Sequence, residues 1–107
     1  MIAIERRRQI SVEGWSSKHD DAHDNGQLAD AAAVYAMSPS YRAFPTDEVG
    51  NTIRTCLWPW DDAWFKPYGG RIRQLAKAGA LIAAEIDRLK RVSYRRRIHS
   101  TKPPKGK

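Results

Sequence analysis

Apolar residues recur every three or four positions in two stretches of the chain, which is the period of an amphipathic α-helix. In the first stretch, residues 27–37, one face carries Leu28, Ala31, Ala32 and Tyr35. In the second, residues 71–92, a seam with a period of 3.5 residues consists of Ile72, Leu75, Gly79, Ile82, Ile86 and Leu89. The pattern predicts two helices with this seam, Ile82 included, buried. A period of 3.5 also fits a coiled coil, so a homodimer stays open beside an intramolecular core.

A third, shorter helix is predicted over residues 4–12, where Ile2, Ala3, Ile4 and Ile10 form a weak apolar stripe. Gly14 ends it, and Trp15 is expected to enter the core. Residues 38–70 form a long connection that holds four of the six prolines. Within it we expect a short helix over residues 46–54, capped by Thr46, and a single turn over residues 61–65. Ser38-Pro39 stops the helix before it.

These elements predict an all-α fold: a small three-helix domain over residues 1–92, with a long Trp/Pro-rich structured loop packed across it. Residues 93–107 form a basic tail with proline and glycine, and we expect this tail to be disordered. The alanines and Gly79 in the helix over residues 71–92 predict close approach to a neighbouring helix. Glu85 and Arg88, one turn apart, are expected to pair.

Three of the four tryptophans fall within seven residues, between prolines, in the segment 58–67. Trp58, Trp60 and Trp64 either fill the core as a lid or form a pocket. Aromatic rings beside cations can hold a base while the cations hold phosphates, and here Lys66 and Arg71 lie next to the rings in sequence. We expect at least one indole to be reachable from a cleft that Lys66 or the loop 19–24 borders.

The second candidate is the loop His19-Asp20-Asp21-Ala22-His23-Asp24. Two histidines four residues apart can bind a metal or act as acid and base, which would make a hydrolase with Glu85. The spacing is weakly specific, however, and a polar loop that caps the next helix explains it as well. We favour that interpretation, keep His19, Asp20 and His23 as candidate ligand or partner contacts beside it, and expect no metal, no cofactor and no catalysis.

The net charge of +7 is unevenly distributed. Residues 1–70 hold seven Lys and Arg against ten Asp and Glu, whereas residues 71–107 hold twelve against two. Such a basic helix and tail can bind nucleic acid through phosphates, with the candidate residues Arg95, Arg96, Arg97, Lys102 and Lys105. The chain has no helix-turn-helix signature, zinc finger, RNP motif, Walker loop or dinucleotide fingerprint.

The lone cysteine, Cys56, excludes an internal disulfide and suits a reducing cytoplasm. Its neighbours Leu57 and Trp58 predict a buried, structural thiol. The charged start of the sequence does not fit a signal peptide, and no apolar run approaches the length of a membrane span.

Several short motifs together resemble a family of small accessory proteins encoded by tailed bacteriophages and proteobacterial prophages. They are Glu5–Ile10, Glu13-Gly14-Trp15, His19-Asp20-Asp21 with His23 and Gly26, Leu28–Ala32 with Tyr35-Ala36, Trp58-Pro59-Trp60 with Trp64–Pro67, and Lys77–Ile82 with Ala84-Glu85-Ile86. The family has no established activity, so the resemblance assigns no functional residue. It implies expression in the cytoplasm of a bacterial host. The basic tail departs from the family pattern.

The sequence therefore predicts a non-catalytic phage or prophage accessory protein. It would bind a host or defence-system component, and so inhibit host defence, or a nucleotide-like ligand. One alternative is a nucleic-acid-binding protein that uses helix 71–92 and the tail. The other is a small metal-dependent or acid–base hydrolase built on His19 and His23.

Overall fold

The structure, a computed structural model, describes residues 1–11 and 20–100, and in this part of the chain it contains helices and no strand. The elements are α1 (Ile2–Ser11), α3 (Gln27–Ala36), α4 (Pro39–Arg42), α5 (Ile53–Leu57), the 3-10 turn η1 (Asp62–Trp64) and α6 (Gly70–Ser100). The predicted all-α class is confirmed, as are the helix over residues 27–37 and the turn over residues 61–65. Among the described residues, no helix is long and apolar enough to span a membrane.

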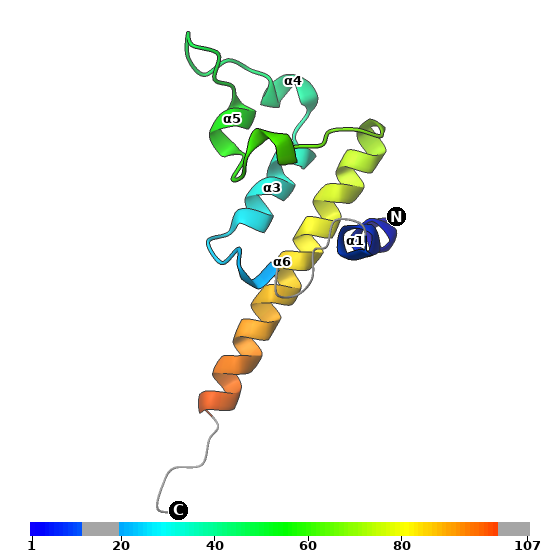
Figure 1. The fold of residues 1–107 in the computed structure, drawn as a ribbon, viewed down its shortest axis with the longest axis vertical. Coiled ribbons are helices and arrows are strands. Elements are labelled where there is room, and N and C mark those ends of the chain that lie inside the picture. The colour runs from blue at the N-terminus through cyan, green and yellow to red at the C-terminus, as the bar shows by residue number, and fades with distance from the viewer. Residues whose placement is uncertain (12–19, 101–107) are drawn as a thin grey trace, which may run out of the picture.

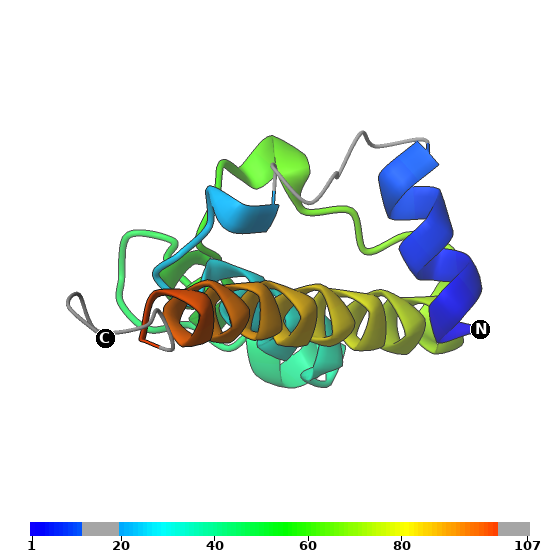
Figure 2. The same cartoon turned by 90° about the horizontal axis from the view of Figure 1, so that it is seen from below.

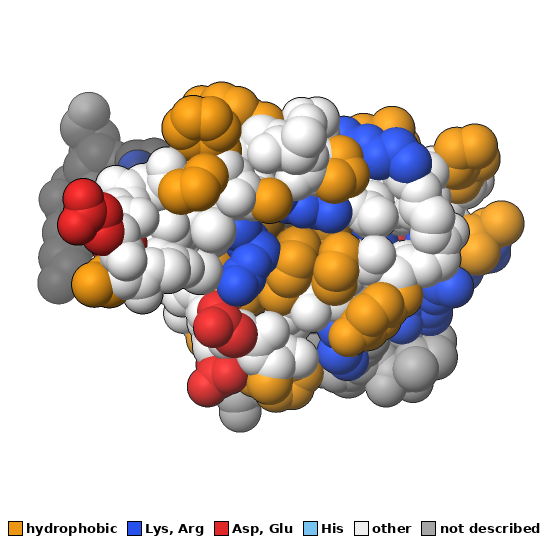
Figure 3. All heavy atoms as spheres, turned by 90° about the horizontal axis from the view of Figure 1, so that it is seen from above, with side chains coloured by type: hydrophobic (Ala, Val, Ile, Leu, Met, Phe, Trp, Pro, Cys, Tyr) orange, Lys and Arg blue, Asp and Glu red, His pale blue; other side chains and the backbone are white. Residues whose placement is uncertain are grey.

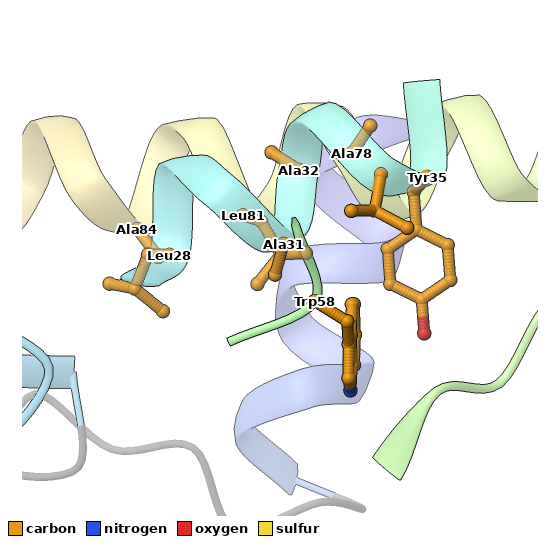
Figure 4. Close-up of a cluster of buried hydrophobic side chains, with 9 residues drawn as sticks. Leu28, Ala31, Ala32, Tyr35, Trp58, Ala78, Leu81 and Ala84 are labelled. Carbon is orange, nitrogen blue, oxygen red and sulfur yellow. The ribbon is translucent and has the colours of Figure 1, made fainter. Parts of the chain in front are cut away.

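The core lies between α3 and α6, which run side by side (Figure 1). Leu28, Ala31 and Ala32 of α3 lie against Leu81, Ala78 and Ala84 of α6, and Tyr35 extends beside Trp58 (Figure 4). Val34 belongs to the same buried cluster. The small side chains of Ala31, Ala32, Ala78 and Ala84 fill the rest, so the two backbones can approach closely. The predicted buried face of residues 27–37 is confirmed.

The predicted seam of α6 is not the face that packs on α3. Leu81 is fully buried, whereas Ile82 exposes 48% of its surface, so the expected burial of Ile82 was wrong. All the large side chains of the seam are exposed in the same way. The reason is that α6 has a second stripe of the same period, made of small or long amphipathic residues, which covers α3: Gln74, Lys77, Ala78, Leu81, Ala84, Glu85 and Arg88.

Helix α1 crosses α6 steeply near the beginning of α6 (Figures 1 and 2). Its buried residues are Glu5 and Gln9, whereas Ile2, Ile4 and Ile10 are exposed, so its weak apolar stripe does not mark its packing face. Ile2 nevertheless lies directly on Gly79. A Cβ atom at that glycine would sit 2.5 Å from the Cδ1 atom of Ile2, which is too close for unshifted side chains.

The connection between α3 and α6 contains α4, which the sequence did not predict, and lacks the helix predicted over residues 46–54. Asp47 is the cause: its carboxylate accepts hydrogen bonds from the backbone of Val49 and Asn51, and these bonds hold a turn instead of a helix. A single bridge joins Pro45 to Thr52. The helix starts later, where Thr52 and Thr55 form a capping box at the beginning of α5.

Cys56, expected to be buried, is exposed on α5, and its Sγ atom lies 3.4 Å from the Oγ1 atom of Thr46. Helix α6 continues past Val92, its predicted end, to Ser100, and the predicted pair is present as an Arg88 Nε to Glu85 Oε1 hydrogen bond of 2.5 Å. Trp15, His19 and the tail residues Lys102 and Lys105 lie outside the described residues.

Candidate ligand-binding site

The Trp/Pro-rich segment packs against the end of α3 through a cluster of aromatic rings. Trp58 is its buried centre and makes edge contacts with Tyr35, Trp60 and Phe65 at centroid distances of 5.5, 5.4 and 5.1 Å. Its indole N–H donates to the carbonyl oxygen of Asp61 at 3.0 Å. The hydroxyl of Tyr35 accepts a hydrogen bond from the backbone N–H of Lys66 at 2.9 Å. Trp58 therefore belongs to the core, as the lid interpretation predicted.

The same cluster reaches the acidic loop. The ring of His23 lies 5.0 Å from that of Trp60, which is half-buried. The structure thus brings together two of the segments that the sequence selected, although they are far apart in the chain. The third tryptophan of the segment is different: Trp64 exposes 53% of its surface, and the ammonium of Lys66 lies 5.6 Å from the centre of its ring.

The aspartates of the loop are engaged by arginines. Asp20 is fully buried and its carboxylate accepts a hydrogen bond from Arg6 of α1 at 2.6 Å. Asp21 accepts from Arg91 at 2.8 Å and from Arg95 at 2.9 Å. These hydrogen bonds, that from Arg91 first, lower the pKa of Asp21 below its ordinary value. In the part of the chain that is described, no three His, Cys, Asp or Glu side chains are grouped as metal ligands.

Arg71, selected as a ligand contact, holds the end of α3. Its guanidinium donates to the carbonyl oxygens of Tyr35, at 2.8 Å, and of Ala36. These carbonyl oxygens accept no hydrogen bond within α3, because the helix ends before the N–H groups that would donate to them. The cation therefore stabilises the helix end, and its position keeps a positive charge beside the aromatic cluster.

A cavity of about 310 Å³ opens beside this cluster, next to Phe65 rather than next to the tryptophans. The Cζ atoms of Arg42 and Arg54 lie 5.2 and 5.0 Å from the centre of the Phe65 ring. The rest of the lining comes from α4, α5 and their connections: Pro39, Ala43, Gly50, Thr52, Thr55 and Pro67. The cavity thus combines an aromatic ring, two guanidinium groups and two threonines.

Arg42 brings a buried positive charge to the wall of the cavity. It is buried, and its guanidinium donates to neutral oxygens, those of the Val34 carbonyl and, at 2.6 Å, the Gln74 side chain. Burial is the main cause that lowers the pKa of Arg42. The positive charges of Arg71 and Arg54 act in the same direction. Because a guanidinium stays protonated in proteins, the buried positive charge persists, and an anion in the cavity would stabilise it.

Phe65, Arg42 and Arg54 were missed by sequence reasoning, which weighed only cations next to the tryptophans along the chain. Arg42 comes from α4, and Arg54 comes from α5, both within the long connection. Seen from above, hydrophobic and basic side chains lie next to one another across the middle of this end of the molecule (Figure 3). The signal available was the length of the connection itself, since long ordered loops are often functional.

The residues selected for nucleic-acid binding are only partly described. Arg95 pairs with Asp21, and Arg96 is exposed on α6. Arg97 lies within the helix, and nothing is described of its side chain; Lys102 and Lys105 fall outside the described residues.

The chain was compared with protein-family models, curated proteins and solved structures, and no family model, no curated protein and no solved structure matches it.

Proposed function

We propose that this protein is a non-catalytic accessory protein of a bacteriophage or prophage that captures a nucleotide-like anion in the cytoplasm of its bacterial host. The observation that carries the ligand is the cavity beside Phe65, where two guanidinium groups flank one aromatic ring. The sequence resemblance supports the phage origin.

The chemistry of the cavity fits a flat, negatively charged molecule. A base can stack on the plane of a guanidinium or on the face of an aromatic ring, and phosphate oxygens accept bidentate hydrogen bonds from arginine. Thr52 and Thr55 add hydroxyl groups to the same wall. The volume of about 310 Å³ is at the small end of known ligand cavities, so it fits a mononucleotide unit better than a large cofactor.

Capture without catalysis is favoured because the described residues that line the cavity include no carboxylate or imidazole that could act as a general acid or base. Asp20 and Asp21 do not line the cavity and form ion pairs, Asp20 with Arg6 and Asp21 with Arg91 and Arg95, and Asp62 pairs with Arg54. The hydrogen bonds from Arg91 and Arg95 lower the pKa of Asp21, which makes this carboxylate a weaker base. The hydrolase built on His19 and His23 stays a prediction, because His19 lies outside the described residues.

The test is calorimetric titration of the protein with AMP, ADP, adenosine and inorganic phosphate. We expect the nucleotides to bind and adenosine and phosphate alone to bind at least tenfold more weakly. Arg54→Gln should weaken nucleotide binding at least tenfold, because the variant keeps the fold but loses one cation of the cavity. Arg96→Gln is the matched control, since Arg96 is exposed on α6, away from the cavity.

Absence of nucleotide binding at millimolar concentration, or equal binding by the two variants, would refute the proposal. A protein co-purifying from bacteria would then point to a host or defence component. The exposed aromatic residues near the site, Tyr41, Phe44 and Trp64, favour that second candidate. Salt-dependent binding to DNA, unaffected by Arg54→Gln, would favour nucleic-acid binding through α6 and the tail.

A further inference from the structure

Helix α6 carries an exposed apolar stripe along a face that α3 does not cover and that α1 contacts at Gly79, through Ile2. Its members are Ile72, Leu75, Ile82, Ile86 and Leu89, with exposed fractions from 46% for Leu75 and Ile86 to 67% for Ile72. A monomer gains nothing from five large aliphatic side chains in a row facing water, and extended apolar patches on soluble proteins mark interaction sites.

The stripe has a gap at Gly79, and a residue from another element fills it. Ile2 of α1 lies over Gly79, and its own side chain is 48% exposed. The apolar surface therefore continues without interruption from Ile72 to Leu89. Over these residues α6 rises by about 25 Å, which is long enough for a helix–helix interface.

The spacing of the stripe specifies the shape of its partner. Steps of three and four residues alternate from Ile72 to Leu89, so the stripe follows the 3.5-residue period of a coiled-coil seam. Such a seam is complementary to a second helix with the same period. Among the described helices of one chain, α3 packs on another face of α6 and α1 contacts this face at Gly79, which leaves the large side chains of the stripe for a helix from outside the chain.

The surface beside Leu89 has the form of a coiled-coil hole. A shallow hollow there is lined by Ile86, Leu89, Lys90, Ser93 and Tyr94. The first four stand at positions i, i+3, i+4 and i+7, the four residues that surround a knob in knobs-into-holes packing. The knob must be an apolar side chain, and Ile72, the most exposed member of the stripe, is one.

Charge decides the direction of the partner. After Asp87 all the charged side chains of the helix are basic, among them Arg88, Lys90, Arg95 and Arg96. Two parallel copies would bring these groups together, and like charges repel. Two antiparallel copies place them at opposite ends and also oppose the two helix dipoles.

We propose that the protein forms an antiparallel homodimer through this stripe. With the two-fold axis between Ala80 and Leu81, Ile72 of one copy faces Leu89 of the other, and Leu75 faces Ile86. Ile82 of one copy then faces Gly79 of the other, where Ile2 lies over the glycine. Every large side chain of the seam therefore meets an apolar side chain. This pairing puts the knob of Ile72 into the hollow beside Leu89.

The shape of the single chain agrees with an unfilled interface. Its radius of gyration is 17.3 Å, compared with about 13 Å for a compact domain of 100 residues. The second half of α6 extends beyond the other helices (Figure 1), so Ile86 and Leu89 are accessible to a second copy. The dimer is independent of the proposed ligand, since the stripe and the cavity beside Phe65 share no residue.

Sedimentation equilibrium measures the dimer directly. We expect the mass of two chains at micromolar concentration, and a dissociation constant at least tenfold higher for Ile86→Lys. Ile10→Lys is the matched control, because Ile10 is an equally exposed isoleucine on α1 outside the stripe, and it should leave the constant unchanged. Circular dichroism verifies that both variants stay folded. A monomer up to millimolar concentration, or equal constants for the two variants, would overturn the proposal.

Disulfide trapping tests the direction. In a Cys56→Ser background, Leu75→Cys and Ile86→Cys are prepared as separate proteins. Antiparallel packing predicts a disulfide only after the two proteins are mixed, because residue 75 faces residue 86 of the other copy. A disulfide formed within either protein by itself, and not between the two, would contradict the antiparallel arrangement.

Discussion

Leu81 and Ile82 are neighbours in sequence but lie on different faces of α6, and replacing each by alanine tests which face belongs to the core. Both changes remove a comparable aliphatic volume, so a difference in their effect reports the difference between the two environments. Leu81 is fully buried between α3 and α6, whereas Ile82 is half exposed.

The structure sets the two magnitudes apart. Truncating a fully buried leucine to alanine costs about 2–5 kcal/mol, including the cavity that it leaves. For Ile82 the three carbons removed are worth about 2 kcal/mol if fully buried. Half-exposure reduces this to about 1 kcal/mol, and water fills the space, so no cavity term is added. The higher helix propensity of alanine returns a few tenths of a kcal/mol.

Thermal unfolding followed by circular dichroism measures the difference. A loss of 1 kcal/mol lowers the Tm of a domain of this size by roughly 4–8 °C, so Leu81→Ala should fall by about 10 °C or more and Ile82→Ala by a few degrees. The protein is kept dilute, below the concentration at which copies associate, so that only the fold of one chain is measured. Equal losses, or a larger loss for Ile82→Ala, would show that the seam is the core face after all.

Two further predictions concern ion pairs. Asp21→Asn should remove a pH dependence of stability, because Arg91 and Arg95 lower the pKa of Asp21 in the folded state. The contribution of Asp21 to stability is complete above the ordinary pKa of about 3.9 and is lost as the pH falls through the lowered value. The stabilities of the two proteins, measured in acid titrations, should therefore differ near neutral pH and converge in strong acid. Arg88→Met should cost about 3–5 kcal/mol in chemical denaturation because it leaves the carboxylate of Glu85 buried without its cation, and the double variant that also carries Glu85→Gln should recover most of that loss; no recovery would contradict this account of the pair.

The helices were predictable where one periodic signal dominated. The face of α3 could be read from Leu28 to Tyr35 because its opposite face is polar or small. Helix α6 has two stripes of the same period, one of large aliphatic side chains and one around Leu81 with small and long amphipathic side chains, and hydrophobicity alone selected the wrong one. The stripe around Leu81 packs on α3 because its small side chains, Ala78 and Ala84, allow close backbone approach and let Lys77 and Arg88 extend along the contact.

The long connection was harder, since its conformation depends on single hydrogen bonds. The bonds from Val49 and Asn51 to Asp47 replace the predicted helix by a turn, and no period in the sequence reports them. For the candidate site, the tryptophans led to the segment that packs beside the cavity, but Phe65 with Arg42 and Arg54 became a unit only through folding. The contact of His23 with Trp60 likewise joins segments that no sequence motif connects.

The end of α3 has a consequence for how the protein is made. Its last carbonyl oxygens are bound by Arg42 from α4 and by Arg71 from α6, and its apolar face is covered by Leu81. During synthesis α3 leaves the ribosome well before α6, so in that interval its apolar face has no partner and its last turn lacks the Arg71 bonds. The domain can fold as a unit only after α6 has emerged. A nascent chain halted before residue 81 should therefore stay open to proteases and chaperones.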